Sequence, residues 1–502
     1  MTTGMDHFLH LWSEISDLVA AQELLSWDQD TMMPTGGQEG RAHLAATLAG
    51  LWHRALTSTE LSDTLEALLA SETEEIARKQ LDEARWHQER ATRMPEELVR
   101  RIAAASSTGV ATWQAARAES DFRIFAPALE EMLDLKQQQA EAIGGGNEPY
   151  DALLDEYEPG MTAAHLERVF ATLTRRLPEL LREVVDSGVQ IDESPVRGDF
   201  SEEGQLEFGR WAAALLGFDI DRGRIDRSAH PFCCGLNRGD VRLTWRPGSG
   251  DFRPGFFGIM HEVGHALYEQ GLPEEWSRTP LGAAASLGVH ESQSRLWENH
   301  VGRHPAFWRG ALPRFKELFP QADGISVDDL WPAFHKIEPS LIRVEADEVT
   351  YNLHILARFE IERSLLSGDL LVVDLPGAWA EVYDRLLGRR PDNDNEGVLQ
   401  DIHWAAGLFG YFPTYCLGSL LSAQLFAAAE GDLGSLEKQF EQLDFAPLLG
   451  WLRDKIHRHG CRYTAAEITE RATGRALSSE AFLSYVEDKA HRLYGIARST
   501  DL

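Results

Sequence analysis

Apolar side chains recur at helical spacing along most of the 502 residues, and this periodicity restricts the fold more than any other feature. In the N-terminal segment, Phe8, Trp12, Ile15 and Val19 fall on one face of a helix. Comparable patterns cover residues 65–141, 163–185, 349–366 and 417 to the C-terminus. The chain is therefore expected to be mostly α-helical.

One short segment departs from this pattern. In residues 240–246 (DVRLTWR), apolar and polar side chains alternate, which is typical of a β-strand. The segment lies just upstream of a strongly helical stretch, so we expect a small β-sheet beside that helix. As an edge strand it would offer backbone hydrogen bonds to an extended peptide, although an ordinary strand in a small sheet fits the same pattern.

The breaks between the helical stretches do not have the length or composition of linkers. The glycine run at residues 144–146 and the polar stretches at 192–198 and 389–393 are short turn signals. The length alone would permit two or three domains. We instead expect one domain over residues 1–502.

Composition argues against several classes of protein. Asp and Glu exceed Lys and Arg by 80 − 48 = 32, so the surface would repel nucleic acid and anionic membranes. No run reaches the roughly 18 apolar residues of a membrane span, and the N-terminus does not have the pattern of a signal peptide. Four cysteines, of which Cys233 and Cys234 are adjacent, do not resemble a disulfide framework. A reduced, cytoplasmic protein is expected.

The pentapeptide HEVGH at residues 261–265 is the clearest chemical signal in the chain. It lies in an amphipathic stretch that is expected to form a helix after Pro254. Residues four apart share one helix face, so His261 and His265 could bind a single zinc ion. Glu262 would then lie beside the metal-bound water.

A third ligand is available in the sequence HESQ, where Glu291 follows His265 after 25 intervening residues. On a second helix packed against the first, this carboxylate would complete a His, His, Glu set and leave one position open for water. These residues predict a catalytic zinc site. The alternative is that they are ordinary core or surface residues.

Such a site would hydrolyse peptide bonds. Zinc lowers the pKa of bound water from about 15.7 to about 7, and Glu262 would take the proton of that water and pass it to the leaving amine. A second donor normally stabilises the oxyanion. The candidates are His230, His403, Tyr411 and Tyr415, each of which could equally be structural.

Recognition of a free C-terminal carboxylate favours an arginine, whose planar fork binds both oxygens. Arg343 follows Pro339 and opens a helical stretch, where an anion would be favoured. Arg242 is a competing candidate. A salt bridge from Arg343 to Glu345 or Asp347 explains the same sequence without any role in binding.

Six motifs lie in order along the chain, and together they resemble the thermostable carboxypeptidase family, also called the carboxypeptidase Taq family. The similarity covers nearly the whole chain and extends to SWDQDTMMP at residues 26–34, GYFPTY at 410–415 and WLRDKIHRHG at 451–460. The six motifs are HPF at residues 230–232, DxRxT at 240–244, HEXXH at 261–265, HESQ at 290–293, IRxxAD at 342–347 and GxxQDxHW at 397–404.

The resemblance implies a single large helical body with a deep active-site groove, as in the angiotensin-converting-enzyme-like and neurolysin-like peptidases. A helical part over roughly residues 1–190 would cover the groove, and roughly residues 200–420 would form the catalytic part. The resemblance further implies a homodimeric metallocarboxypeptidase that releases single C-terminal amino acids with broad specificity. It would bind one Zn²⁺ per chain, which Co²⁺ can replace.

The resemblance also assigns roles to individual residues. The implied metal ligands are His261, His265 and Glu291, the implied general base is Glu262, and Arg343 becomes the carboxylate anchor. The resemblance further implies that His230, His403, Tyr411 and Tyr415 lie in the groove and bind substrate, and Arg242 stays a candidate for substrate binding on the sequence alone.

Two other functions stay open. An endopeptidase or a dipeptidyl carboxypeptidase could use the same zinc chemistry. A catalytically inactive peptide-binding protein belongs to a different class. The complete ligand set and Glu262 argue against that last class, because an inactive relative usually lacks one of these residues.

Overall fold

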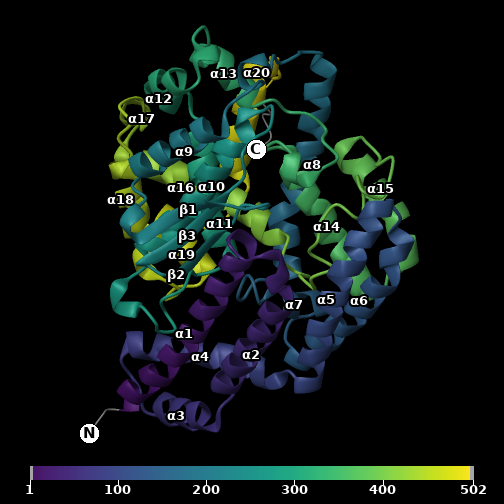
Figure 1. Cartoon of the computed structure of the whole chain (residues 1–502), viewed down its shortest axis with the longest axis vertical. Helices are drawn as coiled ribbons and strands as arrows, with labels where there is room; N and C mark the ends of the chain where they lie inside the picture. Colours follow the sequence, from purple (N-terminus) through teal and green to yellow (C-terminus); the bar gives the residue numbers. More distant parts are fainter. Residues whose placement is uncertain (1–3, 498–502) are drawn as a thin grey trace. The chain divides into compact units, whose positions relative to one another are not determined.

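The computed structural model describes residues 4–497, most of which lie in α-helices (Figure 1). The chain divides into two compact units, each assembled from three separate segments. The first unit comprises the residues up to 92 together with 192–334 and 425–476; the second comprises 93–191, 335–424 and the residues from 477. The mostly α-helical fold class is confirmed. The expected groove and the limits of its parts stay predictions.

The first unit contains most of the helices and the sheet. Its helices are α1 (Gly4–Thr31), α2 (Gln38–Leu56), α3 (Thr59–Leu69), α4 (Glu75–Arg93), α9 (Glu202–Leu216), α10 (Phe252–Gly271), α11 (Leu287–Arg295), α12 (Pro305–Leu318), α13 (Val327–Phe334), α17 (Glu437–Glu441), α18 (Ala446–Lys455) and α19 (Ala465–Thr473). Its strands are β1 (Gly223–Arg227), β2 (Cys233–Asn237) and β3 (Asp240–Trp245).

The second unit is helical. Its helices are α5 (Glu96–Glu119), α6 (Phe122–Ile143), α7 (Pro149–Leu154), α8 (Ala163–Ser187), α14 (Thr350–Ser367), α15 (Leu375–Leu387) and α20 (Glu480–Tyr494). Helix α16 (Pro413–Leu433) begins in the second unit and ends in the first. Helices α5 and α6 lie side by side (Figure 1).

The small sheet has the strand order β1-β3-β2, with β1 parallel and β2 antiparallel to β3. The strand predicted near residue 240 is therefore present; of the two alternatives left open for it, an ordinary strand within a small sheet is confirmed and an edge strand is wrong. Val241 pairs with Gly223 on one side, and Leu243 pairs with Cys233 on the other. Because β3 is paired along both sides, its backbone is not available to a peptide.

Helix α10 packs against this sheet and carries the HEVGH sequence (Figure 1). It begins at Phe252, three residues before the expected start, because the side chain of Asp251 accepts a hydrogen bond from the Arg253 N–H at 2.9 Å. Pro254 is tolerated in the first turn, where no intrahelical bond needs its missing N–H. The buried side chains of Ile259 and Val263 hold the helix in the core.

An aromatic cluster fixes the start of α10 in place. The rings of Phe208 from α9 and of Trp308 from α12 both contact Phe252 and Phe256, with centroids 5.0–6.1 Å apart. Such pairs contribute about 0.5–1.5 kcal/mol each beyond the burial of their area. The helix that carries the two histidines is therefore rigidly anchored at its first turns.

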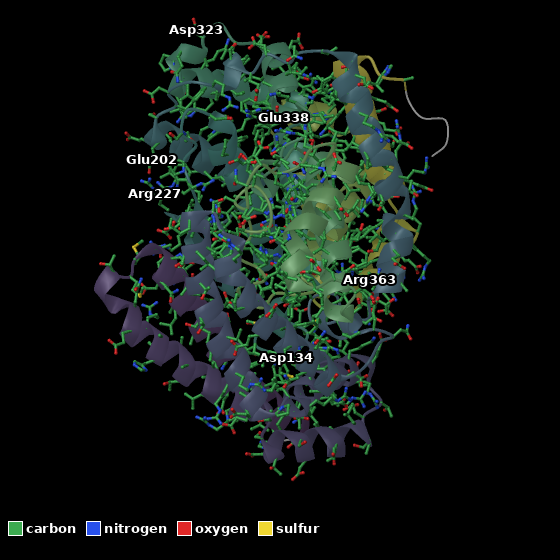
Figure 2. All side chains as sticks on the ribbon, turned by 90° about the vertical axis from the view of Figure 1, so that its right-hand side faces the viewer. Asp134, Glu202, Arg227, Asp323, Glu338 and Arg363 are labelled. Carbon is green, nitrogen blue, oxygen red and sulfur yellow. The ribbon has the colours of Figure 1, made fainter. Side chains whose placement is uncertain are left out.

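Charged side chains lie on the surface of both units. On the first unit, for example, Arg227 donates to Glu202 at 2.8 Å, and both side chains are largely exposed (Figure 2). Within residues 4–497, no helix combines the length and the apolar character that crossing a bilayer requires.

Candidate metal centre

Helices α10 and α11 bring His261, His265 and Glu291 together. Glu291 Oε2 lies 3.5 Å from His261 Nε2 and 3.3 Å from His265 Nε2, and the three ligand atoms all lie within 4.8 Å of one another. A tetrahedral zinc ion with bonds of about 2.0–2.1 Å separates its donor atoms by about 3.3 Å. The two imidazoles and the carboxylate therefore fit a zinc-like ion in donor type and in spacing.

Gly264 permits the close approach of the two helices. A Cβ atom at this position would lie 2.6 Å from Gln293 O and 2.6 Å from Ser294 Cα, which are backbone atoms of α11. Any larger residue would push α11 away from α10. The glycine inside HEVGH thus allows Glu291 to reach the histidines.

The carboxylate of Glu291 is buried and held from both sides. Ser294 Oγ donates to Oε2 at 2.9 Å, and Arg295 Nε donates to Oε1 at 2.7 Å. Burial by itself raises the pKa of Glu291, but the charges of Arg295 and His261 lower that pKa well below its ordinary value. Glu291 is therefore ionised, as a metal ligand must be.

Each histidine has a partner for the ring nitrogen that points away from Glu291. His261 Nδ1 lies 3.0 Å from Glu298 Oε2, and His265 Nδ1 lies 2.6 Å from His290 Nδ1. His290 Nε2 in turn lies 2.7 Å from Glu269 Oε1. Sequence reasoning did not select Glu269 or Glu298. The only signal was spacing, since Glu269 follows His265 by four residues.

Glu262 is only 6% exposed on α10. Burial raises its pKa to about 7, although the neighbouring His261 opposes this rise. A carboxylate with a pKa near neutrality can both accept and return a proton at physiological pH.

The adjacent cysteines in β2 are free thiols, as are Cys416 and Cys461. Neighbouring strand residues point to opposite faces of the sheet. The pKa of Cys233 is raised mainly by burial and to a smaller extent by Glu262. The pKa of Cys234 is raised to about 12, mainly by burial and to a smaller extent by Glu23. Thiols with raised pKa values are poorly reactive, and side chains on opposite faces of a strand do not converge on one ion.

Hydrogen bonds join the HPF sequence, which precedes β2, to the DxRxT sequence in β3. Thr244 Oγ1 accepts hydrogen bonds from the Phe232 N–H at 3.0 Å and from Ser228 Oγ at 2.7 Å. His230 lies exposed in the same loop.

Arg242 forms two hydrogen bonds with Asp240, at 2.8 and 2.9 Å. Its guanidinium also stacks 4.3 Å from the centre of the Trp27 ring, so much of its binding capacity is already used.

Arg343 lies in the second unit and is only 6% exposed. Its Nε and Nη2 donate to Asp401 Oδ1 at 2.9 and 2.8 Å, and its Nη1 donates to Tyr351 Oη at 3.1 Å. The salt bridge of Arg343 is therefore to Asp401. The carboxylate of Asp347 instead accepts hydrogen bonds from the Thr350 N–H and hydroxyl at the start of α14. The IRxxAD and GxxQDxHW sequences meet here.

The helical stretch that Arg343 opens is only one short turn. The residue belongs to a short 3₁₀ turn (Arg343–Glu345), and α14 begins only at Thr350. Asp347 lies between the two, and its carboxylate accepts hydrogen bonds from the N–H groups of Val349 and Thr350 at the start of the helix. The helix dipole of α14 therefore gives no reason for an anion to bind at Arg343.

Three other residues singled out in the sequence gather near Arg343. His403 Nε2 lies 3.3 Å from Tyr415 Oη, and the ring of Tyr411 lies 5.6 Å from that of His403. Burial lowers the pKa of His403 to about 3, although Asp401 opposes this effect. His403 Nδ1 is buried without a hydrogen-bond partner among residues 4–497. Buried polar atoms are rarely left without a hydrogen bond, so this nitrogen has the capacity to bind a further polar group.

Comparison with known proteins gives consistent results over nearly the whole chain. The sequence profile described as carboxypeptidase Taq (M32) metallopeptidase matches residues 7–490. The chain is 44% identical to thermostable carboxypeptidase 1 of Thermus thermophilus, covering 97% of this chain and 98% of the relative. It is 38% identical to carboxypeptidase 1 of Bacillus subtilis, with the same coverage. The crystal structure of an M32 carboxypeptidase from Deinococcus radiodurans matches with a TM-score of 0.96 and 40% identity, covering 99% and 100% of the two chains.

Proposed function

The chain belongs to the carboxypeptidase Taq (M32) family of metallopeptidases and is a metallocarboxypeptidase, and we propose that it releases single C-terminal amino acids from peptides with broad specificity. One observation carries this proposal. Two imidazole nitrogens and one carboxylate oxygen converge at the spacing of a tetrahedral metal site, directly beside a buried glutamate.

We propose His261, His265 and Glu291 as the ligands of one Zn²⁺ per chain, which Co²⁺ can replace. Zinc bound there would polarise the scissile carbonyl and make water acidic enough to react at neutral pH. The neutral imidazoles and the ionised carboxylate are the donors that this ion prefers. Glu262 is the proposed general base. Its carboxylate accepts a proton from the attacking water and returns it to the leaving amine.

We propose Arg343 as the anchor of the C-terminal carboxylate. Arginine has five N–H donors, and three of them are engaged with Asp401 and Tyr351. These contacts fix the guanidinium plane, and two donors remain for a substrate. The unpartnered Nδ1 of His403 supports a second contact with substrate. The further proposed substrate-binding residues are His230, Arg242, Tyr411 and Tyr415.

Arg343→Ala is expected to lower kcat/KM for removal of a terminal residue by about 10- to 150-fold, because a hydrogen bond to a charged group contributes about 1.5–3 kcal/mol. Initial rates on a free-acid peptide measure this effect. Arg385→Ala, which removes an exposed arginine of the same unit, is the control and should leave the rate unchanged. Full exopeptidase activity in Arg343→Ala would contradict the anchor assignment.

The deciding experiment is a time course with free-acid and C-terminally amidated versions of one peptide. Mass spectrometry should show stepwise loss of single residues from the free acid only, and a chelator should abolish this loss. The matched pair isolates the terminal carboxylate, because the two peptides are otherwise identical. Removal of dipeptides would favour a dipeptidyl carboxypeptidase. Internal cuts in both peptides would favour an endopeptidase with the same metal chemistry and would remove the role of Arg343.

We also propose a homodimer, which the family resemblance implies, and a cytoplasmic location, which the composition favours. The excess of acidic residues supports the proposal that the protein binds neither nucleic acid nor anionic membranes, because like charges repel. The four free thiols support a reducing compartment.

A further inference from the structure

The nitrogen of His261 that faces away from the ligand cluster is held by a carboxylate with fixed surroundings. Glu298 Oε2 lies 3.0 Å from His261 Nδ1. Arg303 Nη2 donates to Oε1 of the same carboxylate at 2.9 Å, and Arg295 Nη1 donates to Oε2 at 3.5 Å. A carboxylate between two guanidinium groups is ionised and can only accept hydrogen bonds. When His261 is neutral, as a metal ligand must be, its one proton must therefore lie on Nδ1, which leaves the Nε2 lone pair directed at the cluster.

Glu298 owes its place to an unusual backbone. The segment Leu296–Gly302 is a π-helix that continues directly from α11. Such wide turns are rare and occur mostly at functional sites. One continuous helical segment thus supplies both Glu291, which faces the two histidines, and Glu298, which supports His261 from the other side.

The outward nitrogen of His265 is held by a longer chain of groups. His265 Nδ1 lies 2.6 Å from His290 Nδ1, and His290 Nε2 lies 2.7 Å from Glu269 Oε1. When Glu269 accepts the Nε2–H proton of a neutral His290, His290 Nδ1 can only accept. His265 must then carry its proton on Nδ1. Glu269 therefore selects the tautomer of His265 through a second imidazole, that of His290.

We infer that Glu298 and Glu269 are positioning residues that each hold one histidine of the cluster in its metal-binding tautomer, Glu298 directly and Glu269 through His290. This inference rests on the proposed metal ligands. Partners of this kind fix ring orientation and raise ligand basicity, and their loss typically lowers metal affinity by about 10- to 100-fold. HESQ thereby gains a second role, since its histidine supports one ligand while its glutamate supplies another.

The test is the affinity of the metal-free protein for Co²⁺, measured by visible absorption against a competing chelator. Glu298→Gln and Glu269→Gln should each weaken Co²⁺ binding by about 10- to 100-fold and shift the absorption bands, because the amide can donate where only an acceptor fits. Glu274→Gln is the control. This glutamate lies three residues beyond the end of α10, and its side chain is 84% exposed. It should bind Co²⁺ like the parent.

Unchanged affinity and unchanged spectra in both glutamine variants would overturn the inference. His265→Ala separates this outcome from failure of the proposed function, because that variant should lose Co²⁺ binding whether or not Glu269 matters. Retained Co²⁺ binding in His265→Ala would instead reject the ligand set. The unfolding temperature of each metal-free variant is measured in parallel. Should a glutamine variant unfold, Glu298→Asp and Glu269→Asp keep the charge but shorten the reach, and should weaken binding for the same reason.

Discussion

Glu262→Gln is expected to lower kcat by about 100- to 10,000-fold, the usual contribution of a general base, while the protein keeps its metal. The amide has nearly the shape of the carboxylate but cannot accept the proton of the attacking water. Zinc content should not change, because the proposed ligands are His261, His265 and Glu291. The rate of release of the terminal residue and the zinc content per chain measure the two effects.

The control for this variant is Glu274→Gln, which removes a carboxylate just beyond α10 on an exposed surface and should not alter kcat. Loss of zinc from Glu262→Gln would mean that the carboxylate acts as a ligand. A kcat close to that of the parent would mean that another group moves the proton.

Asp401→Asn is expected to lower the free energy of unfolding by about 3–5 kcal/mol, because it leaves two buried guanidinium groups without a counter-charge. Asp401 binds Arg343 through Oδ1 at 2.8 Å, and Arg358 Nε through Oδ2 at 2.7 Å. Arg358 is 0% exposed and Arg343 is 6% exposed, so water cannot replace the lost carboxylate. The midpoint of urea unfolding measures the change.

A matched control is Glu360→Gln in the same unit, which breaks an exposed pair with Arg385. Exposed pairs contribute about 0–1 kcal/mol, so this variant should unfold close to the parent. A loss in Asp401→Asn no larger than that of the control would show that the buried triad adds little to stability.

The stability that Asp401 contributes to the folded protein has a defined pH dependence. Burial raises the pKa of Asp401, but Arg343 and Arg358 together lower that pKa far below its ordinary value. A carboxylate with a lowered folded pKa contributes its full stability above the unfolded pKa of about 3.9, and loses it as pH falls through the folded pKa. Urea midpoints below pH 4 should therefore fall more steeply for the parent than for Asp401→Asn.

Local spacing along the sequence specifies much of the metal centre. His261 and His265 share a helix face because they are four residues apart, and the HESQ sequence marks Glu291 as the third member. The strand near residue 240 is likewise visible as an alternation of apolar and polar residues. These features are predictable because each depends on the geometry of one helix or one strand.

Other features depend on contacts between segments that are distant in the chain. Asp401 is the partner of Arg343 although nearer carboxylates were available at Glu345 and Asp347. The central place of β3 depends on β1, whose sequence Gly223–Arg227 does not alternate clearly. The amino-acid sequence specifies the periodicity of a helix or strand. Which strand or side chain it pairs with depends on which faces pack together in the folded chain.

The sequence by itself determined the helical class, the helix of the two histidines and the identity of the clustered carboxylate. Only the tertiary structure decided how those groups are supported: Gly264 lets α11 approach α10, the π-helix carries Glu298 to His261, and Glu269 reaches His265 through His290. The physical reason is that the repeat of a helix constrains side chains within about one turn. Support between helices requires distances of about 3 Å, which only the packed backbone sets.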